Sequence, residues 1–172
     1  MPAPGPVPSR QSAPHPHAVV VDSTGEFILV PDLGADLVRI FHINQETGLL
    51  EQQDPLEVGP GSGPRHGAFW THAGDSDSTS CIKFFLVSEL DNALTAYDVE
   101  YPGDGTISLK QTYRGSTFGK MTVPDRAAAA EIAVTPDNNH ILVSNRGDNT
   151  FGPGNDSMAV FSYMDGKVAF SG

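Results

Sequence analysis

Basic residues are scarce in this 172-residue sequence. Ten lysines and arginines stand against 21 aspartates and glutamates, which gives a formal net charge of −11 at neutral pH. A protein that binds DNA, RNA or an anionic membrane surface needs a basic field, so we expect neither a nucleic acid nor a membrane as a partner. Any anion that this chain binds must be held by a local cluster of its few cations.

Cysteine and long apolar runs are scarce as well. Cys81 is the only cysteine, which excludes an internal disulfide and a cysteine-based zinc site, and nothing around it indicates a reactive thiol. No apolar run approaches the roughly 20 residues that cross a membrane. The N-terminal stretch "MPAPGPVPSRQSAPHPH" lacks the basic start and the apolar core of a signal peptide. We expect no membrane span and no leader.

Amphipathic helix periodicity is also missing, and many turn-forming residues are present. Eighteen glycines and fourteen prolines fall between short apolar runs rich in Val, Ile, Phe and Tyr. This pattern is typical of many short strands joined by turns, so we expect an all-β fold. Residues 1–14 are expected to form a proline-rich arm or loop, because proline removes backbone donors and disfavours helix in the residue before it.

One unit occurs three times. The stretches "FILVPDLGADLVRIF" (27–41), "FFLVSELDNALTAYDV" (84–99) and "HILVSNRGDNT" followed by "SMAVFSY" align, with Val30, Val87 and Val143 spaced 57 and 56 residues apart. Each copy holds four apolar strands separated by turns, which is the blade of a β-propeller. We therefore predict about three four-stranded antiparallel blades, with repeats at about 15–60, 61–115 and 127–172. A two-sheet sandwich is the alternative fold, because its strands are also short.

Polar residues gather at one predicted end of these blades. The first two strands of a blade form a hairpin, so the start of the first strand and the end of the second lie together. We expect the radial arrangement of blades to bring these ends to one mouth of the central channel. The starts carry His15, His17, Arg65 and His66, and the ends carry Asp32, Glu89, Asn92, Asn145 and Arg146.

Four of these residues predict an anion site. The planar guanidinium groups of Arg65 and Arg146 suit bidentate contact with a carboxylate or phosphate. Glu89 is a candidate general acid or base, and His17 could share that role. The alternative is that these strand ends are polar because they meet water. Three further histidines, His15, His66 and His72, are expected to be structural or solvent-facing.

Metal and nucleotide sites are not expected. "HPH" holds two histidines, but Pro16 keeps the pair extended and no third ligand follows at a recognisable spacing. "GPGSGPRHG" lacks the Lys-Ser/Thr ending of a phosphate loop and precedes a strand. No G-x-S-x-G elbow is present. The sequence thus predicts no cofactor and no metal.

The motifs "APHPHAVVVDSTGEFILVPDLGAD", "GPRHGAF", "LVSELDNALTAYD" and "EIAVTPDNNHILVSNRGDNT" resemble the cytosolic lactonase family of seven-bladed propellers, from about Arg10 to the end of the chain. This family includes 6-phosphogluconolactonase and carboxy-cis,cis-muconate cyclase. The resemblance implies a metal-free site at His17, Arg65, Glu89 and Arg146, a small anionic lactone or carboxylate as substrate, and a cytoplasmic location. Hydrolysis of a sugar-acid lactone is the expected activity, with His17 and Glu89 catalytic and Arg65 and Arg146 substrate-binding.

Departures from the family pattern qualify these expectations. A seven-bladed ring needs more than twice this length, so the resemblance implies a partial propeller that is inactive alone. "THAGDSDSTSCIKF" is longer than the matching turns and is expected to loop away from the site, whereas Arg126 is expected near the mouth. Muconate cyclisation, which forms a lactone, is one alternative function. A non-catalytic scaffold that binds a protein partner is the other.

Overall fold

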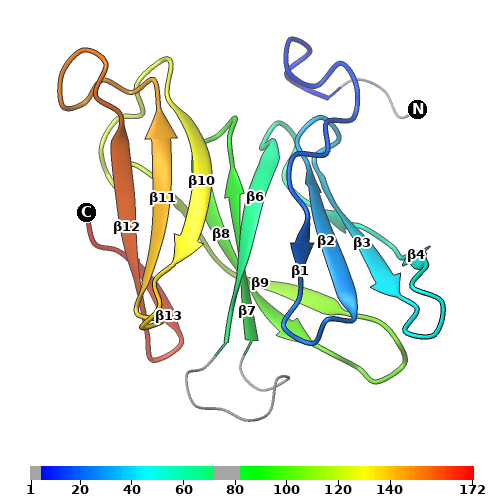
Figure 1. Ribbon diagram of the computed structural model, residues 1–172. Coiled ribbons are helices and arrows are strands. Elements are labelled where there is room, and N and C mark those ends of the chain that lie inside the picture. Colours follow the sequence, from blue (N-terminus) through cyan, green and yellow to red (C-terminus); the bar gives the residue numbers. More distant parts are fainter. Residues whose placement is uncertain (1–4, 72–81) are drawn as a thin grey trace.

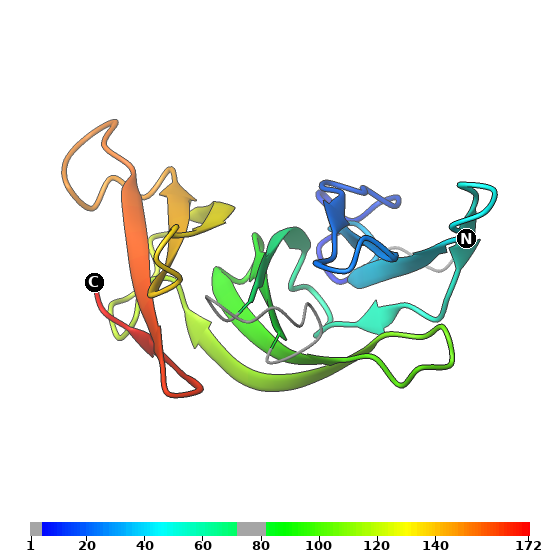
Figure 2. The same cartoon turned by 60° about the horizontal axis from the view of Figure 1, so that its bottom comes forward.

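Three antiparallel sheets stand side by side in an arc in the computed structural model, which describes residues 5–71 and 82–172 (Figures 1 and 2). Within these residues the regular structure is all strand. Each sheet follows chain order from one edge to the other, as in a propeller blade. The predicted all-β partial propeller is confirmed, and two sheets of a sandwich do not describe it.

Strand bounds follow the predicted four-strand unit. The first sheet contains β1 (Val20–Val21), β2 (Phe27–Asp32), β3 (Leu37–Ile43) and β4 (Leu50–Gln52), and β5 (Leu56–Glu57) also pairs with β3. The second contains β6 (Pro64–Trp70), β7 (Ile82–Ser88), β8 (Ala93–Glu100) and β9 (Ser108–Ser116). The third contains β10 (Ala128–Val134), β11 (His140–Arg146), β12 (Ser157–Met164) and β13 (Lys167–Phe170).

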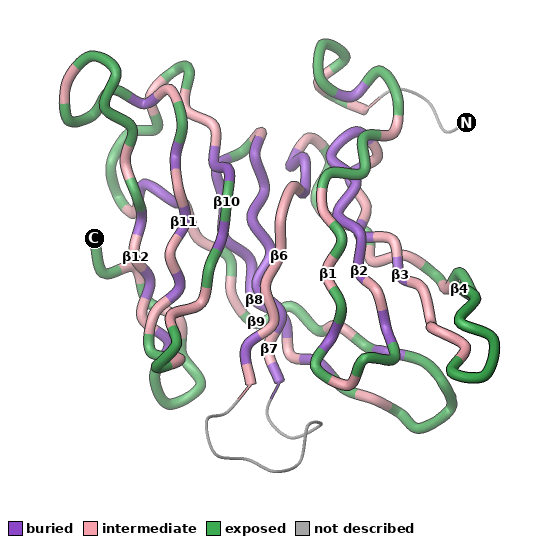
Figure 3. Tube along the Cα trace, viewed as in Figure 1, coloured by how far each residue is buried: buried purple, intermediate pink, exposed green. Residues whose placement is uncertain are grey.

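The two central strands of the middle sheet, β7 and β8, are buried on both faces. Phe84, Phe85, Leu86 and Val87 of β7 have no exposed surface, so consecutive side chains are buried on opposite faces of the strand. Buried residues are concentrated in the middle sheet, around β7 and β8 (Figure 3). Phe84 and Leu86 belong to the core shared with the first sheet, and Phe85 and Val87 to the core shared with the third. Each such side chain stabilises the fold by about 1.5–3 kcal/mol relative to exposure. This explains why β7 reads as a continuous apolar run.

In each of the first two sheets, an acid or amide in the turn after the second strand accepts hydrogen bonds from the backbone at the start of the next sheet. Asp36 accepts hydrogen bonds from the backbone N–H groups of Gly61 and Gly63, at 2.7 and 2.9 Å. Asn92 accepts from the N–H of Ala129 at 2.7 Å. Both residues have a φ of 52°, a left-handed conformation that Asn and Asp tolerate better than other residues with side chains. The turn after the second strand of a blade therefore also fixes the position of the next blade.

The proline-rich arm lies against the first sheet, at the same end as the arrowhead of β11 (Figure 1). Gln11 is fully buried, donates to the carbonyl oxygen of Leu33 at 3.0 Å and accepts from the N–H of Val7 at 3.1 Å. His15 donates its N–H to the carboxylate of Asp32 at 2.7 Å. These contacts hold the arm in one place. Residues 72–81, which include Cys81, His72 and most of the expected insertion, lie outside the described residues. Among the described residues, no helix is long and apolar enough to cross a membrane.

Candidate functional site

Glu89 lies at the centre of a cluster of arginines. Its side chain is 2% exposed, and its Oε2 accepts hydrogen bonds from Nε of Arg65 at 2.8 Å and from Arg146 at 2.7 Å. Its Oε1 accepts a hydrogen bond from Arg10. Three guanidinium groups thus surround one buried carboxylate, which leaves an excess of two positive charges in a protein that is acidic overall. This local excess favours the binding of an anion.

The charge state of Glu89 follows from this arrangement. Burial is the largest single influence and raises the pKa of the carboxyl, because it penalises the charged form. The hydrogen bond and charge of Arg10, with the charges of Arg146 and Arg65, outweigh burial and hold the pKa of Glu89 below its ordinary value. Glu89 is therefore ionised at neutral pH.

Strand pairing explains why these residues meet. At one end of the sheets, Pro16 pairs with Asp32, Pro64 with Ser88 and Ala128 with Arg146. His17 and Arg65, which follow the two prolines, therefore lie at the same end of the first and second sheets. The start of each first strand and the end of each second strand share one end, as the hairpin argument predicted.

A bulge in β6 directs two consecutive side chains to the site. Pro64 pairs with Ser88 and His66 with Val87, so Arg65 is an extra residue in the ladder. Arg65 contacts Glu89 and donates from its NH1 to the carbonyl oxygen of Ala130 at 2.7 Å. Strict alternation would place Arg65 and His66 on opposite faces, and the bulge removes that restriction.

Three residues from three blades form a row beside the arginine cluster. Nδ1 of His17 lies 3.1 Å from Nε2 of His66, and Nδ1 of His66 lies 2.9 Å from Oε1 of Glu131. His17 is largely exposed, but partial desolvation of its ring lowers its pKa, and the charge of Arg65 lowers it further. Burial also lowers the pKa of His66, although Glu131 opposes the shift. Both imidazoles are therefore neutral at pH 7.

The sequence did not predict the contact between Arg10 and Glu89, or the contacts of His66 with His17 and Glu131. Arg10 precedes the first repeat, so the alignment of the three copies does not mark it. His66 was expected to be structural, whereas its ring joins His17 to Glu131. The sequence signal for His66 was its position at a strand start, directly after Arg65.

Other expected residues lie apart from the contacts around Glu89. Asp32 is fully buried and pairs with Arg39 at 2.8 Å. Arg126 is exposed, and its carbonyl oxygen lies against Gly147, the residue after Arg146. His15 is exposed, and its Nδ1 lies 3.1 Å from the carbonyl oxygen of Arg10.

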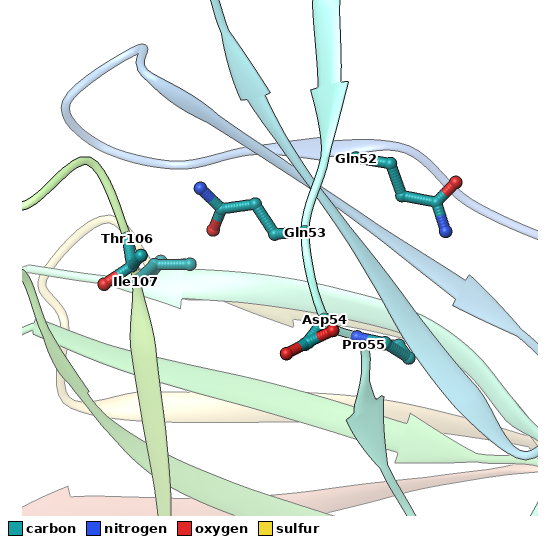
Figure 4. A pocket seen from close by; sticks show the side chains of 6 residues that line it. All are labelled: Gln52, Gln53, Asp54, Pro55, Thr106 and Ile107. Atoms are coloured by element: carbon teal, nitrogen blue, oxygen red, sulfur yellow. The ribbon is translucent and has the colours of Figure 1, made fainter.

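The described residues contain no group of three or more His, Cys, Asp or Glu side chains placed to hold a metal ion. A pocket of about 630 Å³ lies between the segment after β4 and the segment before β9 (Figure 4). Its lining consists of Gln52, Gln53, Asp54, Pro55, Thr106 and Ile107. None of the four predicted site residues lines it, and it offers one charged side chain. The arginine cluster is the better candidate for chemistry.

Comparison with known proteins identifies the family. The model of the family described as "Lactonase, 7-bladed beta-propeller" matches residues 1–172. A protein of Arthroderma benhamiae named "Probable 6-phosphogluconolactonase" is 40% identical over 168 residues, which cover 95% of this chain and 39% of that protein. The 6-phosphogluconolactonase of Yersinia enterocolitica is 30% identical over 145 residues, covering 82% of this chain and 39% of that protein.

Solved structures agree with this assignment. The periplasmic gluconolactonase of Pseudomonas aeruginosa matches with a TM-score of 0.70 and 25% identity, over 93% of this chain and 40% of that one. A protein from Lactobacillus plantarum matches with a TM-score of 0.74 and 27% identity, over 98% of this chain and 43% of that one. The chain belongs to the lactonase family of seven-bladed β-propellers. It spans about two fifths of the length of these relatives.

Proposed function

We propose that this chain carries the anion-binding and proton-transfer part of a lactonase that hydrolyses a sugar-acid lactone bearing a negative charge, most like 6-phosphogluconolactone. The observation that carries the proposal is the cluster of three arginines around buried Glu89, next to a neutral histidine. The names of the relatives support the same reaction class.

Each residue has a role that follows from its contacts. Arg65 and Arg146 bind the phosphate or carboxylate of the substrate, since each guanidinium has further N–H donors beyond those that Glu89 accepts. Arg146 is 47% exposed, which leaves it open to a ligand. Glu89 holds the guanidinium groups in place, and its negative charge favours a proton on His17.

His17 is the proposed general base. It takes a proton from water as the water oxygen bonds to the lactone carbonyl carbon. The ring C–O bond then breaks, and His17 returns the proton to the departing alkoxide oxygen. The open-chain acid leaves, and His17 is neutral again. The low pKa of Glu89 makes it a weak base, so His17 is better suited to accept the proton and Glu89 to stabilise the resulting imidazolium.

Two other functions are less well supported. A carboxy-cis,cis-muconate cyclase would use the same charges to hold a carboxylate that adds across an alkene. The names of the relatives favour hydrolysis over this reaction. A non-catalytic scaffold has no need of a buried carboxylate ringed by arginines. The cytoplasmic location expected from the family resemblance stays a prediction, and one solved relative is described as periplasmic.

The test compares two lactones in an intact protein, that is, this chain extended to a complete seven-bladed ring. We expect 6-phosphogluconolactone to be hydrolysed with a kcat/KM about 100-fold above that of gluconolactone, which lacks the phosphate but has the same ring. Release of acid would be followed with a pH indicator, with the spontaneous rate subtracted. Equal rates for the two lactones would contradict an anion site, and no turnover of either would favour a scaffold.

Arg146→Ala sharpens this comparison. The variant should lose most of the discrimination between the two lactones, because the uncharged substrate never used the guanidinium. Lys110→Ala, which removes an exposed cation from β9, is the matched control and should leave the ratio unchanged. Carboxy-cis,cis-muconate would be supplied to the same preparation, and its conversion would indicate the cyclase.

A further inference from the structure

We propose that His66 and Glu131 are positioning residues that fix which ring nitrogen of His17 carries its proton. This inference rests on the proposed role of His17 as the base. It starts from the row that runs across the first strands of three successive blades, from His17 through His66 on β6 to Glu131 on β10.

The proton positions follow from the partners. An ionised carboxylate only accepts hydrogen bonds, so the neutral imidazole of His66 must place its proton on Nδ1, 2.9 Å from Glu131. Nε2 of His66 is then an acceptor. Nδ1 of His17, 3.1 Å away, must donate to it. His17 therefore holds its proton on Nδ1 and leaves Nε2 with a free lone pair.

That free lone pair is what a general base needs. Nδ1 is the nitrogen of His17 that contacts His66, so Nε2 is the nitrogen left for water or substrate. If the proton stood on Nε2 instead, the nitrogen open to the reaction would be a donor and unable to accept. The row thus selects the productive tautomer before a substrate arrives.

Backbone geometry builds the row. β10 carries a bulge between Ala129 and Ile132, one blade beyond the bulge between Pro64 and His66 in β6. The two irregularities are adjacent, because Arg65 at the first donates to the carbonyl oxygen of Ala130 at the second. Neighbouring bulges thus carry His66 and Glu131 in line with His17.

The charged surroundings of His17 fit this assignment. Arg65 and Arg146 disfavour a second proton on the ring, and Glu89 favours one. His66 faces the ring at a centroid distance of 4.9 Å. When His17 takes a proton during turnover, its Nδ1–H still donates to His66, so the ring keeps its orientation through the reaction.

The test reads the tautomer directly. Intact protein labelled with ¹⁵N at histidine would be studied by NMR at pH 8, where the imidazoles are neutral. We expect His17 to show a protonated Nδ1 and a bare Nε2. In Glu131→Ala the Nε2-protonated form should become populated, and kcat for 6-phosphogluconolactone should fall about tenfold with KM little changed. His66→Phe should shift the tautomer further.

Glu51→Ala is the matched control. Glu51 also pairs with a histidine, His42, at 3.6 Å, and its side chain is 59% exposed against 60% for Glu131. It should alter neither the tautomer of His17 nor kcat. A His17 that carries its proton on Nε2 in the unaltered protein, or a tautomer insensitive to Glu131→Ala, would overturn the proposal.

The lactonase function and the positioning roles of His66 and Glu131 can be tested separately. The NMR result does not depend on turnover, so it decides the positioning roles even if neither lactone is hydrolysed. A tautomer that shifts as expected in a protein without lactonase activity would overturn the proposed function alone. Turnover with an unshifted tautomer would overturn the roles of His66 and Glu131 alone.

Discussion

Arg146 donates a hydrogen bond to Oε2 of Glu89 at 2.7 Å, although 57 residues separate them along the chain. The contact joins the end of β11 in the third blade to the turn after β7 in the second. Arg65 donates to the same oxygen at 2.8 Å. A single carboxylate oxygen therefore orients two guanidinium groups that come from different blades.

Arg146→Ala should weaken the binding of an anionic substrate or product by about 2–3 kcal/mol, which is tens to hundreds of times in Kd. The variant loses one charge-assisted contact, while Arg65 and Arg10 still neutralise Glu89. Calorimetric titration with 6-phosphogluconate would measure the change. Lys110→Ala is the control, and an equal, small loss in both variants would show that Arg146 does not contact the ligand.

Glu89→Gln should remove most turnover while sparing binding. Glutamine keeps the shape of the side chain but not its charge, so a protonated His17 loses its stabilising neighbour and kcat should fall by about 100-fold or more. The excess of positive charge at the site grows, so the Kd for 6-phosphogluconate should stay or improve. Asp91→Asn makes the same chemical change two residues away, where the acid pairs with Arg114, and should leave kcat near its original value. Weaker binding in Glu89→Gln would contradict the assignment.

Stability should fall as the pH falls from 8 to 5.5. Burial lowers the folded-state pKa of His17 and His66 below the ordinary value of about 6.5. The unfolded chain therefore binds more protons than the folded protein as the pH falls through that value, and the free energy of unfolding declines. Urea denaturation at several pH values would measure the slope. His66→Phe should flatten it, and an identical slope in the variant would argue against a lowered pKa of half-buried His66.

Asn92→Ala should cost about 2–4 kcal/mol of unfolding free energy. The change leaves the buried N–H of Ala129 without its acceptor and forces alanine into a left-handed conformation. Asn92→Asp should cost less, since it keeps the acceptor and matches Asp36 of the first blade. Chemical denaturation compares the three proteins, and equal stability of the alanine variant would show that this hydrogen bond contributes little.

The 172-residue chain expressed alone should have little lactonase activity and should self-associate. Val21 of β1 is exposed on the first sheet and Met158 and Met164 on the third, whereas β7 and β8 of the middle sheet are covered on both faces. Repeat units gain much of their stability from contacts with neighbours, and open apolar faces favour association. Sedimentation and lactone hydrolysis would be compared with those of the same chain extended to a complete seven-bladed ring. A monomeric chain as active as the ring would contradict this expectation.

The fold was predictable because its causes are local. The alternation of apolar runs and turns is repeated at a nearly constant spacing, so the blades and their hairpins follow from the pattern. The meeting of Arg65, Glu89 and Arg146 follows as well, because the hairpin brings the strand start and the strand end together.

The rest of the site depends on features that strand periodicity does not contain. Arg10 reaches Glu89 because buried Gln11 anchors the arm, a contact between residues far apart in the sequence. His66 and Glu131 meet because each of two strands carries a bulge, and a strict period of two gives no sign of an extra residue. Asp32 has the same position in the aligned repeat as Glu89. Its carboxylate, however, already accepts hydrogen bonds from Arg39 and from the N–H groups of His15 and Ala35.

Because Arg65 and Arg146 both donate to one oxygen of Glu89, the geometry of the site depends on the angle between neighbouring blades. Arg65 and Glu89 lie in the second blade and Arg146 in the third, so opening the angle between these two sheets would lengthen the hydrogen bond from Arg146 to Glu89. An anion bound by both guanidinium groups would oppose that change, because it adds contacts to both blades. Ligand binding should therefore stiffen the ring where it occurs, and the shape of the ring should in turn tune affinity for the ligand.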